Sequence, residues 1–322
     1  MFKLSVIYRL SGMIMLFFIG LSFWSCSTKA IRQPTDPPEI LARVRFDNHK
    51  IGERYGNADV KRDFGTVKSW GTYWPYQRVR IARFDDPVHD KVLEVRYPRG
   101  KVRSMRSGAS WFWKPVAPRQ EAWFSYWVYF PDSLEFRAGG KLHGLVGGKA
   151  NTGGNKPNGH DGWSCRVHWG ENDYIKLYIY HKDQVLQWGD VYYFHHNPEP
   201  FDVSTANKLP GHSENDVHVT KGEWHHIMMH VKVNDIGQKN GIAQAWYDGK
   251  PVVNLYGFEF RDETVKPENL LIDGVYFSTF FGGRDERYKP VKNEYILFDD
   301  FILAKSMVCP PELTCEPISV QE

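Results

Sequence analysis

Short segments in which apolar and polar residues alternate recur along this chain after residue 40, and turn residues separate them. No long stretch shows the 3.6-residue apolar period of an amphipathic helix, whereas a period of two is typical of a strand with one buried face. Their number and spacing predict an all-β fold, a β-sandwich with few helices. The clearest strand candidates are residues 92–97, 122–130, 164–169, 174–181, 224–233, 243–247 and 295–303.

One hairpin can be predicted from its turn. Trp224 opens one candidate strand, and the strand after it is followed by Asp248 and Gly249, a dipeptide suited to a two-residue turn. This arrangement resembles the penultimate hairpin of concanavalin-like jelly rolls. Because the composition does not change between residues 40 and 306, we expect one jelly-roll domain at residues 41–306 and a C-terminal tail at residues 307–322.

The N-terminus is typical of an export signal. Basic residues precede the apolar residues 10–24, which are too few for a membrane span of about 20 residues and lead to Cys26. The pattern resembles a bacterial lipoprotein signal, so we expect a signal peptide at residues 1–25, lipidation of Cys26 and a flexible tether at residues 26–40. Ordinary secretion is the alternative. The protein is then exported, either secreted or held at the outer membrane or cell surface by the lipid alone.

Composition narrows the range of partners. The formal charge of +3 is too small for nucleic-acid binding, which needs a clustered basic field. Aromatic residues form 15% of the chain, and they favour strands and stack on sugar rings.

Residues 139–162 contain nine glycines and predict one or more loops. Gly147-Gly148-Lys149 resembles part of a phosphate loop, but the hydroxyl residue that should follow the lysine is missing, so we do not expect nucleotide binding. We also expect no cofactor, and we expect the protein to be a monomer.

The cysteines and histidines do not predict a metal site. Cys309 and Cys315 either close a small surface loop or remain free thiols, and Cys165 is expected to be buried filler. Residues 225, 226 and 230 are histidines, but strand alternation places the first on the opposite face from the other two.

Two consecutive strand candidates share one unusual face. Alternation places one set of side chains on the apolar face: Cys165, Val167, Trp169, Ile175, Leu177 and Ile179. The other face then carries Ser164, Arg166, His168, Lys176, Tyr178 and Tyr180. An ordinary solvated face is rich in Thr, Glu and Lys, whereas this one gathers Arg, His and two Tyr.

These residue types suit cleavage of a uronate polysaccharide by β-elimination. A base must remove the proton on C5, which is weakly acidic because the neighbouring carboxylate is negative, so that carboxylate has to be neutralised. Arg166 suits this role through its bidentate guanidinium. Tyr, Lys and His can remove the C5 proton and protonate the departing O4 oxygen once their pKa values are tuned. A Tyr beside Arg and Lys is expected to be stabilised as phenolate.

Several segments together resemble one family. Residues 140–148 are similar to the Lys-Leu-Pro-Gly-Leu-x-Gly-Gly segment of polysaccharide lyase family 14, alginate and glucuronate lyases built on a jelly roll. The resemblance continues through Ser164-x-Arg166, Trp169 and Tyr178-x-Tyr180 to residues 277–283 and 298–301. It spans most of residues 90–303, and its order and spacing make it more specific than any single motif.

The resemblance implies roles for individual residues. Lys141 is implied as a catalytic base, Ser164 and Arg166 as holders of the substrate carboxylate, and Tyr178 and Tyr180 as the proton-transfer pair. The substrate implied is an acidic polysaccharide of the alginate or glucuronan type. His143 stands where the family has proline, and we expect its imidazole to change the path of this loop or the chemistry of a subsite. The further candidates for substrate binding are His168, Lys176 and Gln184.

Other interpretations of the same residues stay open. Lys141 could be a solvated loop charge, Arg166 could pair with a cross-strand carboxylate, and the tyrosines could be ordinary strand residues. A non-catalytic carbohydrate-binding module would need aromatic platforms without this cluster. A glycoside hydrolase would need two facing carboxylates, for which Glu259 and Asp262 are the poorly patterned candidates.

Overall fold

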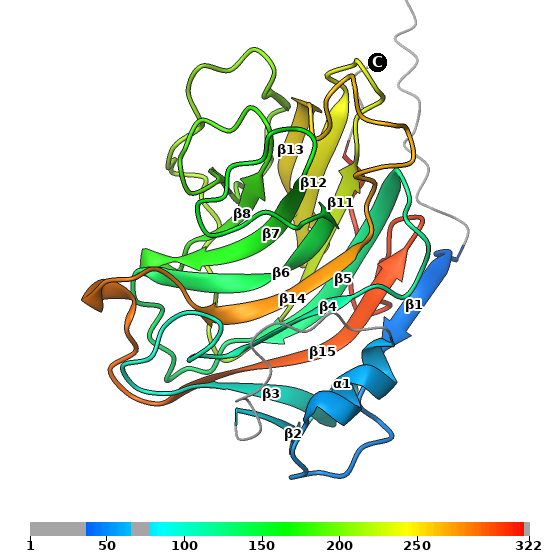
Figure 1. The fold of residues 1–322 in the computed structure, drawn as a ribbon. Coiled ribbons are helices and arrows are strands. Elements are labelled where there is room, and N and C mark those ends of the chain that lie inside the picture. Colours follow the sequence, from blue (N-terminus) through cyan, green and yellow to red (C-terminus); the bar gives the residue numbers. More distant parts are fainter. Residues whose placement is uncertain (1–36, 66–77, 319–322) are drawn as a thin grey trace, which may run out of the picture. The chain divides into compact units, whose positions relative to one another are not determined.

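The computed structural model describes residues 37–65 and 78–318, and its regular structure is almost entirely strand (Figure 1). Within these residues one sheet has nine strands, in the order β10-β13-β12-β11-β5-β15-β3-β2 with β1 against β15. The other has six strands, in the order β4-β14-β6-β7-β8-β9. The two sheets form a jelly-roll β-sandwich, which confirms the all-β prediction.

The strands of the two sheets alternate along the chain. The larger sheet contains β1 (Ile40–Val44), β2 (Val79–Arg83), β3 (Lys91–Tyr97), β5 (Glu121–Tyr129), β10 (Phe201–Asp202), β11 (Trp224–Lys232), β12 (Gly241–Tyr247), β13 (Lys250–Phe258) and β15 (Glu294–Ala304). The smaller sheet contains β4 (Ala109–Trp113), β6 (Gly139–Gly148), β7 (Gly162–Gly170), β8 (Ile175–Tyr180), β9 (Asp190–Tyr193) and β14 (Gly274–Phe281). Each of the seven predicted strands coincides with one of these.

Helical structure in the described residues is limited to α1 (Asn57–Phe64) and the 3-10 turns η1 (Glu171–Asp173) and η2 (Glu286–Tyr288). Helix α1 lies beside β2 and β3 (Figure 1). It buries Val60 and Phe64, and the Phe64 ring packs edge-on against Trp111, 5.2 Å between ring centroids. The helix therefore closes one end of the core.

The predicted Asp-Gly turn joins β12 to β13. Tyr247 pairs with Lys250, and both intervening residues are left-handed, with φ of 50° at Asp248 and 79° at Gly249. Two left-handed residues are the requirement of a type I′ turn, in which Asp-Gly is favoured.

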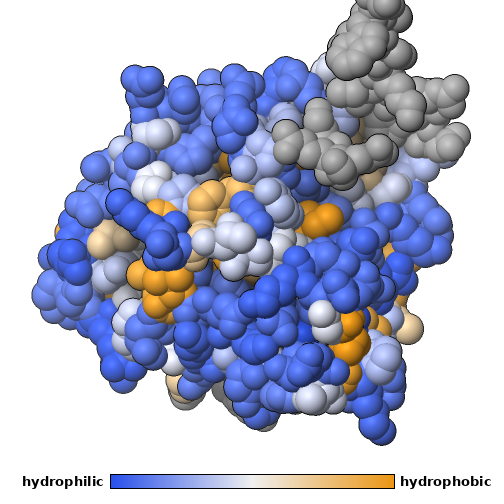
Figure 2. All heavy atoms as spheres, turned by 90° about the horizontal axis from the view of Figure 1, so that it is seen from above, coloured by the Kyte–Doolittle hydropathy of each residue, from blue (hydrophilic) through white to orange (hydrophobic). Residues whose placement is uncertain are grey.

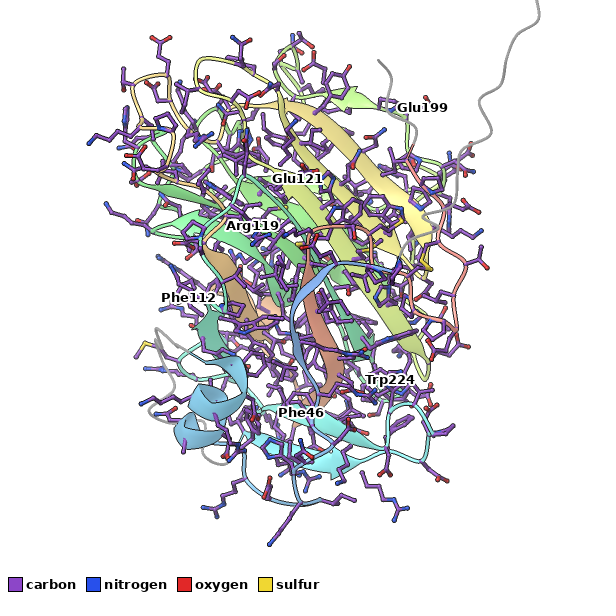
Figure 3. The ribbon with its side chains drawn as sticks, turned by 90° about the vertical axis from the view of Figure 1, so that its right-hand side faces the viewer. Phe46, Phe112, Arg119, Glu121, Glu199 and Trp224 are labelled. Carbon is purple, nitrogen blue, oxygen red and sulfur yellow. A yellow bond between two sulfur atoms is a disulfide. The ribbon has the colours of Figure 1, made fainter. Side chains whose placement is uncertain are left out.

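The core lies between the sheets and contains the apolar faces predicted for β7 and β8. Cys165, Val167 and Trp169 of β7 and Leu177 and Ile179 of β8 are completely buried in it. Figure 3 shows Phe112 of β4 and Trp224 of β11 on opposite sides of the side chains that fill the sandwich. The surface seen from above is mainly hydrophilic, with small separate apolar patches (Figure 2).

The prediction that residues 139–162 are loops is wrong for their first ten residues, which form β6 between β7 and β14. Glycine is needed here for close packing and does not mark a loop. A Cβ at Gly140 would lie 1.9 Å from the Trp169 ring, and a Cβ at Gly144 would lie 2.0 Å from the Cys165 carbonyl oxygen. Only residues 149–161 of the stretch connect strands.

A β-bulge interrupts β6 at Leu142 and His143. Lys141 pairs with His168 and Gly144 with Arg166, so two residues of β6 oppose one of β7. Leu142 is completely buried in the core, and the His143 ring stacks on Phe277 in the same core, 3.9 Å between centroids. The bulge thus turns two consecutive side chains inward and leaves Lys141 on the outer face.

His143 therefore belongs to the core and not to a loop or a subsite. Its Nδ1 accepts a hydrogen bond from the backbone N of Ser278 at 3.0 Å. Complete burial lowers its pKa well below the usual value, so the imidazole is neutral.

The structure decides between a disulfide and free thiols for the cysteines near the C-terminus. Cys309 and Cys315 form a disulfide, and Cys165 is a buried free thiol of the core. Cys26 and the signal peptide lie outside the described residues.

The close contact between β6 and β7 makes a stability prediction. Gly144→Ala should lower the free energy of unfolding by about 2–3 kcal/mol, because the new methyl group meets backbone atoms of β7 that cannot turn away. Urea unfolding measures the loss. Gly211→Ala is the matched control, because its Cβ would meet no atom within 4 Å. Equal stability of the two variants would contradict this description of β6.

Candidate active site

The polar face predicted on β7 and β8 forms a grid with β6 on the outside of the smaller sheet. One row consists of Lys141, His168 and Lys176, which are paired across the three strands. In the next row Gly144, Arg166 and Tyr178 are paired, and Ser164 pairs with Tyr180 beyond them. Figure 1 shows β6, β7 and β8 side by side. The structure thus places Lys141 on the same face as the β7 and β8 candidates.

Lys141 is a strand residue in contact with other bases. Its Nζ lies 2.9 Å from His168 Nε2 and 4.2 Å from the centroid of the Tyr178 ring. Burial, together with the charges of Arg166 and Lys176, lowers the pKa of Lys141 well below its usual value. A lysine in this position is poised to be a neutral amine, and it is not a solvated loop charge.

The pKa values of the neighbouring bases are lowered as well. Burial lowers the pKa of His168 well below its usual value, and the charge of Lys141 adds to the effect. Burial also lowers the pKa of Lys176 to about 8. Near neutral pH, Lys141 and His168 therefore resist protonation, whereas Lys176 still carries its charge.

Arg166 is a buried cation without a carboxylate partner. Its side chain is 2% exposed, and among the described residues no salt bridge involves Lys141, Arg166 or Lys176. Arg166 Nη1 donates a long hydrogen bond to Ser278 Oγ at 3.4 Å, and its Cζ lies 5.4 Å from the Tyr178 and Tyr276 rings. Buried charges are normally paired, so this guanidinium has donors left for an anionic ligand. The cross-strand ion pair considered above does not form.

Tyr178 and Tyr180 belong to one chain of hydrogen bonds. The two hydroxyls are 3.1 Å apart, Gly154 N donates to Tyr180 Oη at 3.0 Å, and Tyr178 Oη donates to the Trp188 carbonyl. Because the amide can only donate and the carbonyl can only accept, Tyr180 donates to Tyr178.

The expectation of a stabilised phenolate is wrong for Tyr178. Burial raises the pKa of Tyr178 well above its usual value although Arg166 acts to lower it. Tyr178 is therefore a protonated phenol, which can act as a proton donor.

Two other predicted site residues already form hydrogen bonds within the protein. Ser164 Oγ donates to the Asn151 carbonyl at 2.7 Å, and Gln184 Nε2 donates to the Leu186 carbonyl at 2.7 Å. Ser164 remains on the face of the grid, whereas the Gln184 amide hydrogen bonds within the segment between β8 and β9.

Sequence reasoning missed Ser278 and Tyr276, which approach Arg166 from β14. A signal was available, because alternation along residues 274–281 places these two side chains on one face and Phe277 on the other. Figure 3 labels Phe112, whose ring stacks on Tyr276 at 4.5 Å, so this edge of the grid has an aromatic wall.

The described residues contain neither a candidate membrane span nor a candidate metal site. No helix there has both the length and the apolar character that crossing a membrane requires. No three His, Cys, Asp or Glu side chains gather there in a way that could hold a metal ion. His225 instead bonds Asp248 through Nδ1 at 2.7 Å.

Comparison with known proteins gives a family match. Residues 85–301 match the model of the family described as polysaccharide lyase 14, which is more than half of the chain. No curated protein matches the sequence.

Solved structures with the same fold include three lyases. Alginate lyase Aly36B has 24% identity and a TM-score of 0.65, covering 84% of this chain and 98% of its own. The PL-14 alginate lyase from Aplysia kurodai has 19% identity and a TM-score of 0.61, with coverages of 83% and 99%. Alginate lyase vAL-1 from Chlorella virus has 19% identity and a TM-score of 0.58, with coverages of 80% and 100%. At these identities the likeness establishes the shared β-sandwich.

The electrostatics of the grid can be tested without a substrate. Acetic anhydride acetylates only neutral amines, so the midpoint of the rate against pH reports each lysine's pKa. Peptide mass spectrometry should place Lys141 and Lys176 below the usual value of 10.5. Lys182 is the control, because its hydrogen bonds to Asp262 and Glu259 outweigh burial and raise its pKa. A Lys141 midpoint as high as that of Lys182 would refute the description.

Proposed function

The chain belongs to polysaccharide lyase family 14 and is a polysaccharide lyase, and we propose that it cleaves a uronate polymer of the alginate or glucuronan type by β-elimination at the β6-β7-β8 grid. The observation that carries the proposal is a buried arginine with no carboxylate partner, beside a lysine of lowered pKa and a protonated tyrosine. The named alginate lyases of the same fold support the choice of substrate.

In the proposed reaction Arg166 neutralises the uronate carboxylate. Its guanidinium sits opposite Gly144, which has no side chain to cover it. A charge-assisted, bidentate hydrogen bond from a nearly dry site withdraws charge from the carboxylate and makes the C5 proton more acidic. Ser278 orients the guanidinium through Nη1.

Lys141 is the proposed base. As a neutral amine it takes the proton from C5, and the electron pair left on C5 forms the C4–C5 double bond as the C4–O4 bond breaks. His168 holds the amine through Nε2 and carries no carboxylate partner that would restore the positive charge. Lys176, in the same row, adds the repulsion that keeps Lys141 deprotonated.

Tyr178 is the proposed acid. Its phenol is protonated and delivers its proton to O4 of the departing sugar, which leaves as an alcohol. The phenolate that remains accepts the hydrogen bond that Tyr180 already donates, so the second tyrosine stabilises the charge. Together with Lys141 this balances one proton taken and one returned.

The two alternative functions lack support. A hydrolase needs two carboxylates across the scissile bond, but Glu259 and Asp262 both bind the ammonium of Lys182 at 2.9 Å. A pure binding module does not require basic groups of lowered pKa in contact with a protonated phenol.

The reaction is tested by incubating the protein with alginate and glucuronan and following the ultraviolet absorbance of the unsaturated product. Arg166→Ala, Lys141→Met and Tyr180→Phe should each lower kcat/KM by about 100-fold or more, because each removes a group that acts in the transition state. Tyr256→Phe, an exposed tyrosine on β13 of the other sheet, is the control. New reducing ends without the chromophore would show hydrolysis, and full activity of the three variants would defeat the site assignment.

The proposal also includes export. The disulfide between Cys309 and Cys315 supports an oxidising compartment, in keeping with the lipoprotein-type signal at residues 1–25. In a bacterial host, an alkyne-tagged fatty acid should label the full chain and fail to label a Cys26→Ser variant, which should leave the membrane fraction. Equal labelling of the two proteins would contradict lipidation at Cys26, and a soluble, unlabelled wild type would indicate plain secretion.

A further inference from the structure

A large groove lies on the outer side of the larger sheet, away from the grid. It has a volume of about 1010 Å³ and is lined from β2, β3, β5 and β15. None of its lining residues belongs to the grid on β6, β7 and β8. At one end its wall includes Phe84 and Tyr129, both packed on Trp224, which Figure 3 places on the opposite side of the sandwich from Phe112.

Two arginines in this groove share a single carboxylate. Arg80 binds both oxygens of Glu94 through Nε at 2.9 Å and Nη2 at 2.8 Å, and Arg96 Nε binds Glu94 Oε1 at 2.5 Å. The carboxylate is 7% exposed, whereas the two arginine side chains are 43% and 46% exposed. Glu94 therefore fixes two open guanidiniums on the sheet and compensates only one of their two charges.

The fixed guanidiniums keep donors for a ligand. Each guanidinium has five N–H groups, of which these contacts use two from Arg80 and one from Arg96. Arg78 adds a further charge, since its hydrogen bonds all go to backbone carbonyls, the closest being that of Gly108 at 2.9 Å. The acidic residue Glu294 in the lining is bound to Lys292 and adds no net charge. The groove thus carries surplus positive charge on a rigid frame.

The same groove offers an aromatic surface. Tyr295 is 37% exposed beside the arginines, on a strand in the middle of the sheet. Burial raises its pKa, and Glu94 reinforces the effect, so the ring is neutral. Sugar rings stack on such faces while their carboxylates reach neighbouring guanidiniums.

We propose that this groove is a second binding site for an acidic polysaccharide, which Arg80 and Arg96 hold by their free N–H groups and Tyr295 by stacking. The identity of the ligand rests on the proposed function, whereas the site rests on the groove itself. A polymer held there keeps further segments of the same chain, or of neighbouring chains, near the enzyme and raises their effective concentration at the grid. A short oligosaccharide can occupy only one of the two sites at a time, so the second site does not raise its effective concentration at the grid.

The test compares long and short substrates. In the double variant Arg96→Gln/Tyr295→Ser, Glu94 keeps its two bonds to Arg80. We expect its KM for polymeric alginate or glucuronan to rise about 10-fold with kcat unchanged, while kcat/KM for a tetrasaccharide stays at the wild-type value. The matched control is Lys250→Gln/Tyr256→Ser, which removes one charge and one exposed tyrosine from β13 of the same sheet, outside the groove. A polymer KM equal to that of the control overturns the proposal.

Binding is also measured apart from catalysis. In the Tyr180→Phe background, where cleavage is slowed, electrophoresis through a gel that contains the polymer should show retardation that the groove substitutions reduce and that added salt weakens. Equal retardation with and without the groove substitutions, or equal retardation by a neutral glucan, overturns the proposal. If the wild type cleaves no uronate polymer, the proposed function fails, and the retardation assay still decides whether the groove binds one.

Discussion

The close contact between the backbones of β6 and β7 is the constraint on which the proposed catalytic face depends. Gly140 and Gly144 allow it, because any side chain at these positions would meet the Trp169 ring or the Cys165 carbonyl. The bulge at Leu142 then turns two residues into the core and leaves Lys141 facing outward beside His168. Without the glycines the strands could not approach, and without the bulge the lysine and the Arg166 row would fall out of register.

That geometry also explains the charges. If the arginine were buried against a carboxylate, the sheet surface would be stable but would have no donors free for a ligand. Here the cations lie together without a carboxylate, and part of the free-energy cost of burying them appears as lowered pKa values. Tyr178 departs in the other direction, because burial outweighs the nearby guanidinium. The proposed base is thus neutral and the proposed acid is protonated, one row apart, which is the division of roles that an elimination requires.

Alternation alone was sufficient for much of this structure. It correctly predicted seven of the fifteen strands in the described residues, the apolar faces of β7 and β8 and the shared face of Arg166, His168, Tyr178 and Tyr180. It failed at β6, because a stretch with nine glycines and few large apolar residues, such as residues 139–162, is typical of loops. Whether a glycine permits a turn or a close approach depends on the partner strand. The inward position of His143 could not be predicted either, since a bulge is a property of pairing between strands. The pKa of Tyr178 depends on how deeply its side chain is buried, which cannot be predicted from the sequence.

The proposed mechanism requires a uronate carboxylate to occupy the donors left free on Arg166. A crystal structure of an inactive Lys141→Met variant with a bound uronate trisaccharide tests it most directly. We expect one carboxylate to lie within hydrogen-bond distance of the Arg166 guanidinium, with C5 of that sugar turned toward position 141 and its O4 toward the Tyr178 hydroxyl. A trisaccharide bound across the grid with its carboxylates directed away from Arg166, or with C5 turned toward solvent, would contradict it.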